Sequence, residues 1–186
     1  MRGALGQTYD DWIDSDSWKA GQDSEDAFGV ILKGKYPEAR KATLEEQYEH
    51  KDWICSVGSI DVKALKSKNR GSTRQEDYIW IEFRNNVGDD GWLYGTQDFV
   101  AFEGYKDYII VRTNDLRALS EGLCDINNRV DSAGAALYKG YSRKNRSDLI
   151  SMIRRSDLLN INHKVLKKPC RTSTNTTAGT RYSSRT

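Results

Sequence analysis

The stretch HKDWICSVGSIDVKALK, residues 50–66, contains the pattern that decides the expected fold. Two short apolar runs, at 53–57 and 60–65, flank the dipeptide Gly58-Ser59. Short apolar runs that are rich in β-branched and aromatic residues and are separated by a glycine-containing turn are typical of a β-hairpin. We therefore expect two antiparallel strands in this stretch.

The spacing of charged residues in this hairpin predicts a functional face. Asp61 and Lys63 are two residues apart on one strand, so their side chains point to the same face of the sheet. The predicted register pairs Ile54 with Asp61 and leaves 56–59 as the turn. Asp52 then lies opposite Lys63 and projects from the same face, whereas a slip of one residue would reverse it.

A helical pattern precedes the hairpin, from about residue 22 to residue 35. Apolar residues, Phe28 and Leu32 among them, recur at the spacing of one helical face, and Ser24 is a candidate N-cap. Glu25 lies three residues before Phe28 and seven before Leu32, so it shares the inward face of the helix. Glu25 is therefore a third acidic residue that could reach the hairpin.

The remaining patterns predict an α+β fold. Three further runs are typical of strands, at 78–83, 99–102 and 108–111. Helices are expected from Asn114 through Leu123 and over 148–159. The order of one helix, about five strands and then helices indicates a central mixed β-sheet flanked by helices, not a doubly wound dinucleotide fold. The glycine-rich loops GxGxxG and GxxxxGK[ST] are absent from the sequence.

The chain of 186 residues is long enough for one domain with tails. We expect a polar N-terminal arm at 1–19, a single domain at 20–168 and a disordered basic tail at 169–186. Within the domain, the expected core covers about 22–118, and 119–168 form a C-terminal helical part. The sequence contains no apolar run of membrane-spanning length and no signal peptide, which predicts a cytoplasmic protein without a membrane partner.

The charge distribution favours a nucleic-acid partner. The net charge is only +2, but the basic residues form local patches that suit a phosphate backbone. Ordinary solvated faces are the alternative interpretation of such patches. The candidate DNA-binding residues are Lys66, Lys68, Arg70, Arg74, Arg143, Lys144 and Arg146.

The hairpin face has the chemistry of a divalent-cation site. Two nearby carboxylates, here Asp52 and Asp61, repel each other, and their burial without a partner is costly. Mg²⁺, or Mn²⁺ in its place, relieves both penalties, prefers oxygen ligands and is commonly held by carboxylates together with a substrate phosphate. Glu25 would supply a third carboxylate if its helix packs against this face. Lys63 could orient a nucleophilic water and the scissile phosphate.

Several motifs resemble those of the PD-(D/E)XK nuclease superfamily, which includes restriction enzymes, junction resolvases and repair nucleases. The matching segments are YEHKDW (48–53), DVKALK (61–66), RQEDYIWIEF (74–83) and GWLYGTQDFVAFE (91–103). Within the superfamily, the chain is most similar to resolvase-like endonucleases of phages and viruses. The resemblance covers about residues 24–118 and a later stretch, YSRKNRSDLI. No proline precedes Asp52, and the middle acid is Asp61 where glutamate is commoner.

The resemblance implies a restriction-endonuclease-like core and a metal-dependent endodeoxyribonuclease that leaves a 5′-phosphate. It also implies a host-cytoplasm location if the chain comes from a phage or virus, and roles in DNA recombination or repair. Its catalytic positions fall on Glu25, Asp52, Asp61 and Lys63, with the three acids as metal ligands. A homodimer is compatible with this reading.

Three further residues are candidates for supporting roles around the site. His50 could hydrogen-bond the site, Gln75 could orient water or substrate, and Glu82 could reach the metal or a substrate-binding partner. For His50 and Glu82, the alternatives are a structural hydrogen bond and a cross-strand salt bridge. Two other functions stay open: a catalytically inactive nucleic-acid-binding protein on the same fold, and a protein that acts on host proteins through its acidic N-terminus.

Overall fold

The computed structural model describes residues 16–69 and 72–169. The first half of the chain forms α2 (Asp16–Lys35), β1 (Arg40–Lys41), α3 (Leu44–Tyr48), β2 (Trp53–Cys55), β3 (Gly58–Lys63), β4 (Lys66–Ser67), β5 (Arg74–Gln75), β6 (Tyr78–Arg84) and η1 (Trp92–Tyr94). The second half forms β7 (Phe99–Glu103), β8 (Asp107–Arg112), α4 (Thr113–Leu123), β9 (Asp125–Val130), η2 (Ala133–Ala135), β10 (Lys139–Tyr141), β11 (Leu149–Arg154), η3 (Arg155–Asn160) and β12 (His163–Lys167).

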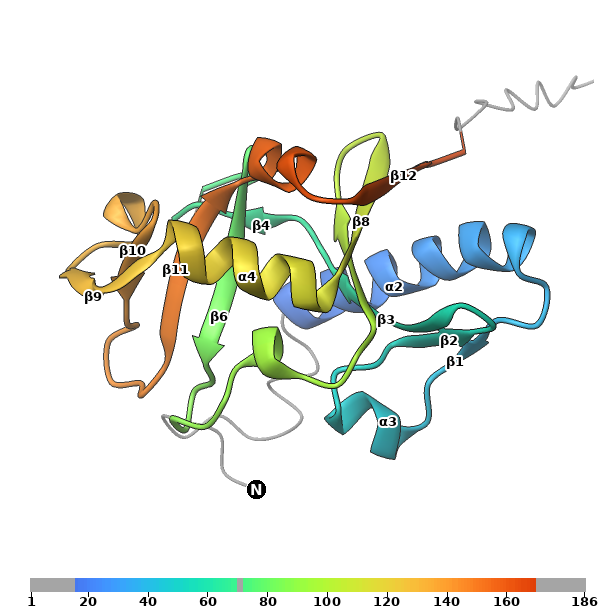
Figure 1. Cartoon of the computed structure of the whole chain (residues 1–186), viewed down its shortest axis with the longest axis horizontal. Coiled ribbons are helices and arrows are strands. Elements are labelled where there is room, and N and C mark those ends of the chain that lie inside the picture. Colours follow the sequence, from blue (N-terminus) through green and yellow to red (C-terminus); the bar gives the residue numbers. More distant parts are fainter. Residues whose placement is uncertain (1–15, 70–71, 170–186) are drawn as a thin grey trace, which may run out of the picture.

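The protein has an α+β fold built on a mixed sheet, as the sequence predicted. The described strands form a six-stranded sheet in the order β1-β2-β3-β7-β8-β12, a four-stranded sheet in the order β6-β11-β10-β9, and the hairpin β4-β5. In the larger sheet, β3 and β7 are parallel and the other neighbours are antiparallel. In Figure 1 this sheet lies between α2, in blue, and the second sheet, which contains β6 and β11. The expectation of a single sheet of about five strands was therefore too simple.

Helix α2 covers one face of the six-stranded sheet. Phe28 and Leu32 are almost completely buried and pack against Ile60 and Val62 of β3 and against Tyr108 of β8. The rings of Phe28 and Tyr108 meet edge to face, with centroids 5.1 Å apart. Because side chains alternate along a strand, the neighbours of Ile60 and Val62 on β3 point away from α2.

The opposite face of the same sheet forms the larger core. Val100 and Phe102 of β7 pack there with Ile81 of β6, Ile153 of β11 and Leu116 of α4, all nearly fully buried. The six-stranded sheet is thus buried on both faces. A polar residue on β3 that faces this second core is shielded from water and must find a polar partner.

The hairpin forms, but its register differs from the predicted one. Trp53 pairs with Ile60 and Cys55 with Gly58, so the turn is shorter than expected. Pairing is displaced by two residues, which places Asp52 across from Asp61 instead of Lys63. A displacement by an even number of residues keeps every side chain on its original face, so Asp52 still lies on the same face as Asp61 and Lys63.

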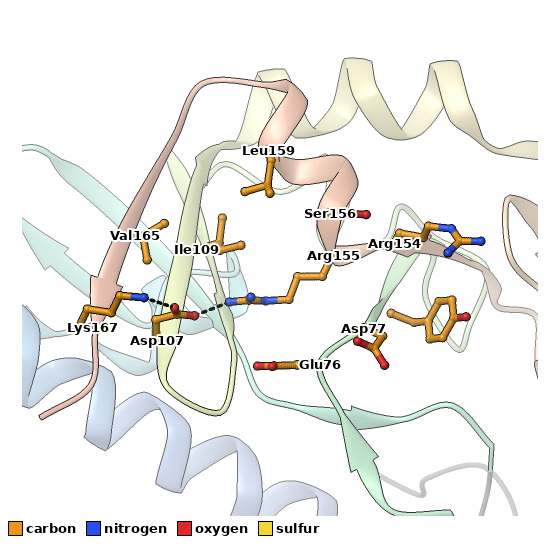
Figure 2. A pocket seen from close by; sticks show the side chains of 11 residues that line it. Glu76, Asp77, Asp107, Ile109, Arg154, Arg155, Ser156, Leu159, Val165 and Lys167 are labelled. Atoms are coloured by element: carbon orange, nitrogen blue, oxygen red, sulfur yellow. Dashed lines mark hydrogen bonds and ion pairs between the residues drawn. The ribbon is translucent and has the colours of Figure 1, made fainter. Parts of the chain in front are cut away.

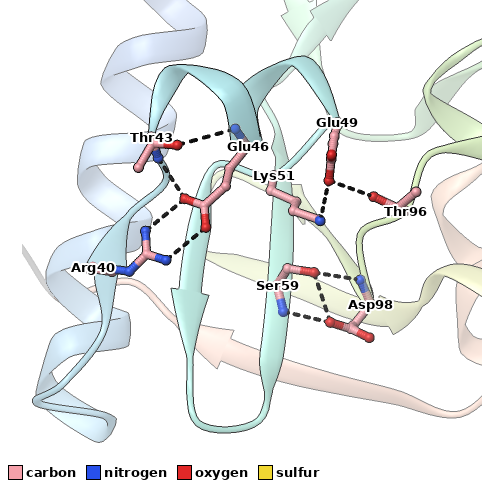
Figure 3. Close-up of polar contacts among 8 residues, drawn as sticks. All are labelled: Arg40, Thr43, Glu46, Glu49, Lys51, Ser59, Thr96 and Asp98. Carbon is pink, nitrogen blue, oxygen red and sulfur yellow. Dashed lines mark hydrogen bonds and ion pairs between the residues drawn. The ribbon is translucent and has the colours of Figure 1, made fainter.

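Polar contacts hold the outer end of this hairpin (Figure 3). Asp98 accepts hydrogen bonds from the Ser59 amide and hydroxyl, each at 2.8 Å. A capping box joins Thr43 and Glu46 at the start of α3, and Arg40 contacts both carboxylate oxygens of Glu46, at 2.7 and 2.8 Å. These contacts attach the segment before Asp52 to the edge of the sheet.

Two element predictions were wrong. The predicted helix over 148–159 is strand β11 followed by the short helix η3, and the predicted helical part at 119–168 consists mostly of strands. Residues 149–153 are all buried because β11 lies inside the four-stranded sheet, between β6 and β10. A strand buried on both faces loses its alternating pattern, so its apolar run cannot be distinguished from a helix by periodicity.

The first helix begins earlier than predicted, at Asp16, so residues 16–19 of the expected arm are helical. Ser24 is a buried interior residue, not the N-cap, and its hydroxyl lies 3.5 Å from the Tyr108 hydroxyl. The rest of the predicted arm, Arg70 and nearly all of the predicted tail lie outside the described residues. None of the described helices is long and apolar enough to cross a membrane.

Candidate active site

The structure brings Asp61 and Lys63 together on the face of β3 that turns away from α2. Asp61 Oδ2 lies 2.7 Å from Lys63 Nζ, and the exposed fractions of the two side chains are 4% and 26%. The contact has ion-pair distance but not hydrogen-bond geometry, so this buried oxygen has no hydrogen-bond partner among the described residues. The Lys63 ammonium also lies 4.8 Å from the centre of the Trp92 ring, a cation–π contact.

Asp52 completes a carboxyl pair with Asp61. Asp52 lies in the short loop between α3 and β2, and its Oδ2 accepts a hydrogen bond of 2.6 Å from the Val62 amide. The two carboxyls are close enough for the charge of Asp61 to raise the pKa of Asp52. Two carboxylates that lie this close repel each other. Uptake of a proton or of another cation would therefore stabilise the site.

Burial and mutual repulsion change the acidity of this pair. Burial, and secondly the Asp61 charge, raise the pKa of Asp52 to about 7. Burial also raises the pKa of Asp61, although the Lys63 ammonium acts in the opposite direction. For Lys63, burial alone would lower the pKa, but Asp61 and Asp52 outweigh it and the pKa is raised. Lys63 is therefore charged at neutral pH and serves as a cationic group rather than a base.

Glu25 is near the pair, but other residues hold its carboxylate. Its helix packs on the face of β3 opposite the one that carries Asp61 and Lys63, whereas the prediction assumed packing on the same face. Gln22 Nε2 donates to both Glu25 carboxylate oxygens at 3.1 Å, and Lys41 Nζ lies 3.5 Å from Oε2. Burial, and then the Asp52 charge, raise the pKa of Glu25 to about 7, which shows that the two carboxyls still interact.

The three predicted supporting residues have different surroundings. The His50 ring makes no hydrogen bond to the described residues, and burial together with the Lys63 charge lowers its pKa to about 4, so it is neutral. The Gln75 amide bonds the backbone of Lys66 and Tyr78 and holds the β4-β5 hairpin to β6. It is therefore not free to orient water.

Glu82 lies on the Lys63 side of the site and has no ion pair among the described residues. Burial raises its pKa, while the charges of Lys63 and Arg143 act against the increase. The backbone of Trp92 also acts against the increase, with a smaller effect. Glu82 is thus a half-buried carboxylate that faces the same ammonium group as Asp61, from the second sheet.

Part of the predicted basic surface borders this site. Burial, and then the positive charges of Lys63, Arg74 and Arg143, lower the pKa of Lys66. Four cations that repel one another in this way form a local positive field that an anion would relieve. Lys66 Nζ contacts the Ser17 hydroxyl at 3.2 Å, and Arg74 Nη2 contacts the Asp16 carbonyl at 3.0 Å.

The other predicted DNA-binding residues are spread around this cluster. Lys68 lies 4.4 Å from the centre of the Tyr78 ring, and Lys144 is exposed. Arg143 is paired with the fully buried Asp148 and, at 2.7 Å, with Asn86, which Arg146 also contacts at 3.2 Å. The loop that contains Arg143, Lys144 and Arg146 is therefore held in place by the contacts of its two arginines.

One residue of the site was not singled out from the sequence: Lys41, in the two-residue strand β1, which holds Glu25. Trp92, whose ring lies beside the Lys63 ammonium, belongs to the Gly-flanked segment GWLYG. For this aromatic residue the sequence suggested stacking on nucleotides or core packing, and favoured core packing. Nothing in the local pattern around Lys41 distinguishes it from a surface lysine.

Comparison of the chain with models of protein families, with curated proteins and with solved structures gave no match.

The donor set fits a divalent cation, although the ligand sphere is incomplete. Among residues 16–69 and 72–169, no three His, Cys, Asp or Glu side chains are arranged as a metal-binding group. The buried carboxyl of Asp61, with its unsatisfied oxygen, and the half-buried carboxyl of Asp52 nevertheless offer the hard oxygen donors that Mg²⁺ prefers. Mg²⁺ usually keeps several waters and takes further ligands from substrate phosphate, so two protein carboxylates are sufficient.

The raised pKa values of Asp52 and Glu25 predict how the stability of the protein depends on pH. In the folded protein, the pKa of Asp52 is about 7, compared with an ordinary value of 3.8. The folded state therefore binds a proton more tightly, and the stabilisation that this provides is lost as pH rises from about 4 through about 7. In EDTA, the thermal midpoint should be higher at pH 5 than at pH 8.

Asp52→Asn keeps the shape of the side chain and removes its charge, so it should flatten this pH dependence. Glu25 contributes to the same slope, so the flattening should be partial. A thermal midpoint in EDTA that does not change between pH 5 and pH 8 would contradict the proposed burial of the carboxyl pair.

Proposed function

We propose that this protein is a Mg²⁺-dependent DNA endonuclease with Asp52, Asp61 and Lys63 at its centre. The observation that carries the proposal is the carboxyl pair of buried Asp61 and half-buried Asp52, which lies beside a charged lysine and in which Asp61 Oδ2 has no hydrogen-bond partner among the described residues. Two further features agree with a restriction-endonuclease-like core of the PD-(D/E)XK type. The strand that follows Asp52 and the strand that carries the DxK motif are neighbours in one mixed sheet, and a helix with an acidic residue packs on that sheet.

Each group of residues has a separate task in this proposal. Asp52 and Asp61 would hold the cation, which would supply a water of lowered pKa and neutralise charge that develops on the phosphate. Lys63, fixed between Asp61 and the Trp92 ring, places an ammonium group where it can bind a phosphate oxygen. Lys66 and Arg74 extend the positive surface and would contact neighbouring phosphates without reading sequence.

Glu25 would bind the cation only after a change in its present contacts. Its carboxylate would join the cation if the contact with Lys41 is released, because Lys41 and a metal ion compete for the same oxygens. The Lys41 ammonium lies 3.5 Å from Glu25 and 3.0 Å from the exposed Asp26, so it keeps an ion-pair partner when Glu25 is released. Glu25 therefore remains in the proposed ligand set as an exchangeable third carboxylate.

A second function, DNA binding without catalysis, is favoured by one observation. No group of three potential ligands is assembled among the described residues, and Glu25 is paired with a lysine. A protein that uses the same basic surface only to bind DNA would need nothing more. The two functions differ in whether a divalent cation leads to strand cleavage.

The test is incubation of the purified full chain with supercoiled plasmid and with labelled linear and four-way-junction DNA. Mg²⁺, Mn²⁺ and EDTA are compared at equal ionic strength, because salt alone changes DNA binding. We expect cleavage with Mg²⁺ or Mn²⁺ and none with EDTA. Binding of the same DNA without cleavage under any divalent condition would favour the second function and reject the nuclease.

A further inference from the structure

A cavity lies outside the carboxyl pair, between the start of β6, the strands β8 and β12, and η3 (Figure 2). Its volume is about 600 Å³, within the usual range of pockets for small molecules. Figure 2 shows Asp107 on one side of the cavity, held by Lys167 and by Arg155. Leu159 lies on the opposite wall.

This cavity adjoins the proposed catalytic centre. A second, smaller cavity of about 100 Å³ is lined by Lys63 and Lys66, together with Trp80 and Trp92. Both cavities are lined by Glu76 and Tyr78, so these two residues form a common wall. A chain of nucleotides whose phosphate lies at Lys63 could therefore continue past Tyr78 into the larger cavity.

The lining of the larger cavity offers apolar and cationic contacts. Leu159 and Val165 are large apolar residues that both line the cavity, with exposed fractions of 53% and 42%, so their side chains are accessible to a ligand. Arg154 and Lys167 provide exposed cations, and the Lys167 side chain is 75% exposed despite its contact with Asp107. Such an exposed ion pair is weak, so Lys167 can contact a phosphate instead.

The acids of the lining narrow the class of ligand. Asp77 is exposed, and its carboxylate can accept hydrogen bonds from exocyclic amino groups. Glu76 is half-buried and its Oε2 accepts from the Tyr105 amide at 2.7 Å, so its other carboxylate oxygen is the one that can accept from a ligand. A polyanion without hydrogen-bond donors would be repelled by these acids, whereas a nucleotide combines a phosphate, an apolar ring face and amino groups. Inside an intact duplex, a base keeps its faces stacked and its amino groups paired, so only an unpaired nucleotide presents all three.

We infer that this cavity binds one unpaired nucleotide of the substrate strand beside the scissile phosphate. The inference rests on the proposed nuclease function and specifies its substrate class: DNA with a single-stranded extension or branch, in preference to blunt duplex. Apolar contact with Leu159 and Val165 holds the base. Lys167 or Arg154 contacts its phosphate, and Tyr78 separates this position from the catalytic one.

Equilibrium binding in EDTA tests the inference without any cleavage. The probes are a fluorescein-labelled blunt duplex and the same duplex with three unpaired nucleotides at its 5′ or 3′ end, measured by fluorescence anisotropy. We expect one of the extended probes to bind about tenfold more tightly, because only an unpaired nucleotide adds the apolar and phosphate contacts of the cavity.

Leu159→Glu and Lys167→Glu each place a negative charge at the cavity and change exposed side chains, so folding should be preserved. Both should reduce the tenfold preference to about twofold or less and leave blunt-duplex affinity within about twofold. Leu44→Glu, at a leucine of α3 that is 64% exposed, is the matched control and should keep the full preference. Thermal midpoints equal to the wild type establish that the variants are folded.

Two results would overturn the inference: equal affinity of the wild type for blunt and extended probes, or an undiminished preference in both cavity variants. Cleavage with Mg²⁺, measured in parallel, separates this failure from failure of the proposed function. Cleavage without preference rejects only the cavity, while preference without cleavage rejects the nuclease and retains a nucleotide-binding cavity.

Discussion

Replacement of Asp61 by Asn should reduce the rate of DNA cleavage by at least about 100-fold. The substitution removes a buried negative charge that the proposed cation needs, and the charge stabilisation provided by a metal ion amounts to several kcal/mol of the barrier, with about 1.4 kcal/mol for each factor of ten. Lys63→Gln should cause a loss of similar size, because it removes the ammonium group 2.7 Å from Asp61 Oδ2. Single-turnover cleavage with saturating Mg²⁺ is the measurement.

The two substitutions should have opposite effects on DNA binding in EDTA. Asp61→Asn removes a negative charge and should leave affinity unchanged or increase it, whereas Lys63→Gln removes a phosphate contact and should weaken it. Asp115→Asn, in the first turn of α4, is a control that should retain wild-type cleavage. Cleavage within a few-fold of the wild type in both Asp61→Asn and Lys63→Gln would eliminate this site.

Substitution of Gly29 by Ala should lower the free energy of unfolding by about 2 kcal/mol or more, as expected for overpacking of a buried contact. A Cβ atom at this position would lie close to three atoms of the Trp53 ring, the farthest of them at 2.6 Å. Trp53 is buried, and its Nε1 donates to the Glu25 carbonyl at 3.0 Å, so the ring has little freedom to move away. Chemical denaturation with urea measures the change.

The same helix provides a matched control. A Cβ at Gly21 would meet no atom within 4 Å, so Gly21→Ala should stabilise the protein by about 0.5–1 kcal/mol through helix propensity alone. Opposite signs at the two positions would establish close contact between α2 and β2. A stabilising effect of Gly29→Ala would contradict the docking of α2 described above.

Because Trp53 adjoins Asp52 in the chain, Gly29→Ala should also lose cleavage activity.

The hairpin shows why the common face was predictable although the register was not. The predicted and observed pairings differ by two residues, and an even displacement leaves every side chain on its original face. The ion pair of Asp61 and Lys63 follows from their spacing on one strand. The exact pairing depends on the turn, where Gly58 adopts a φ of 134°, and on the contact of Asp98 with Ser59.

Glu25 shows the limit of the same reasoning. Its place on the inward side of the first helix was inferred from spacing relative to Phe28 and Leu32, and both of these residues are buried as expected. The face of the sheet that receives the helix is not encoded in that spacing. Lys41, which is distant in sequence and holds Glu25, was invisible for the same reason.

Local pattern alone determined that the protein has an α+β fold, that a hairpin lies at 53–63 and that Asp61 and Lys63 share a face, because strand alternation does not depend on distant neighbours. Only the tertiary structure decided that 149–153 form a strand, that α2 covers the face opposite Asp61, and that Trp92 supports Lys63. These features arise from contacts between segments far apart in the chain, where the gain from burial outweighs local preference and leaves no periodic signal in the sequence.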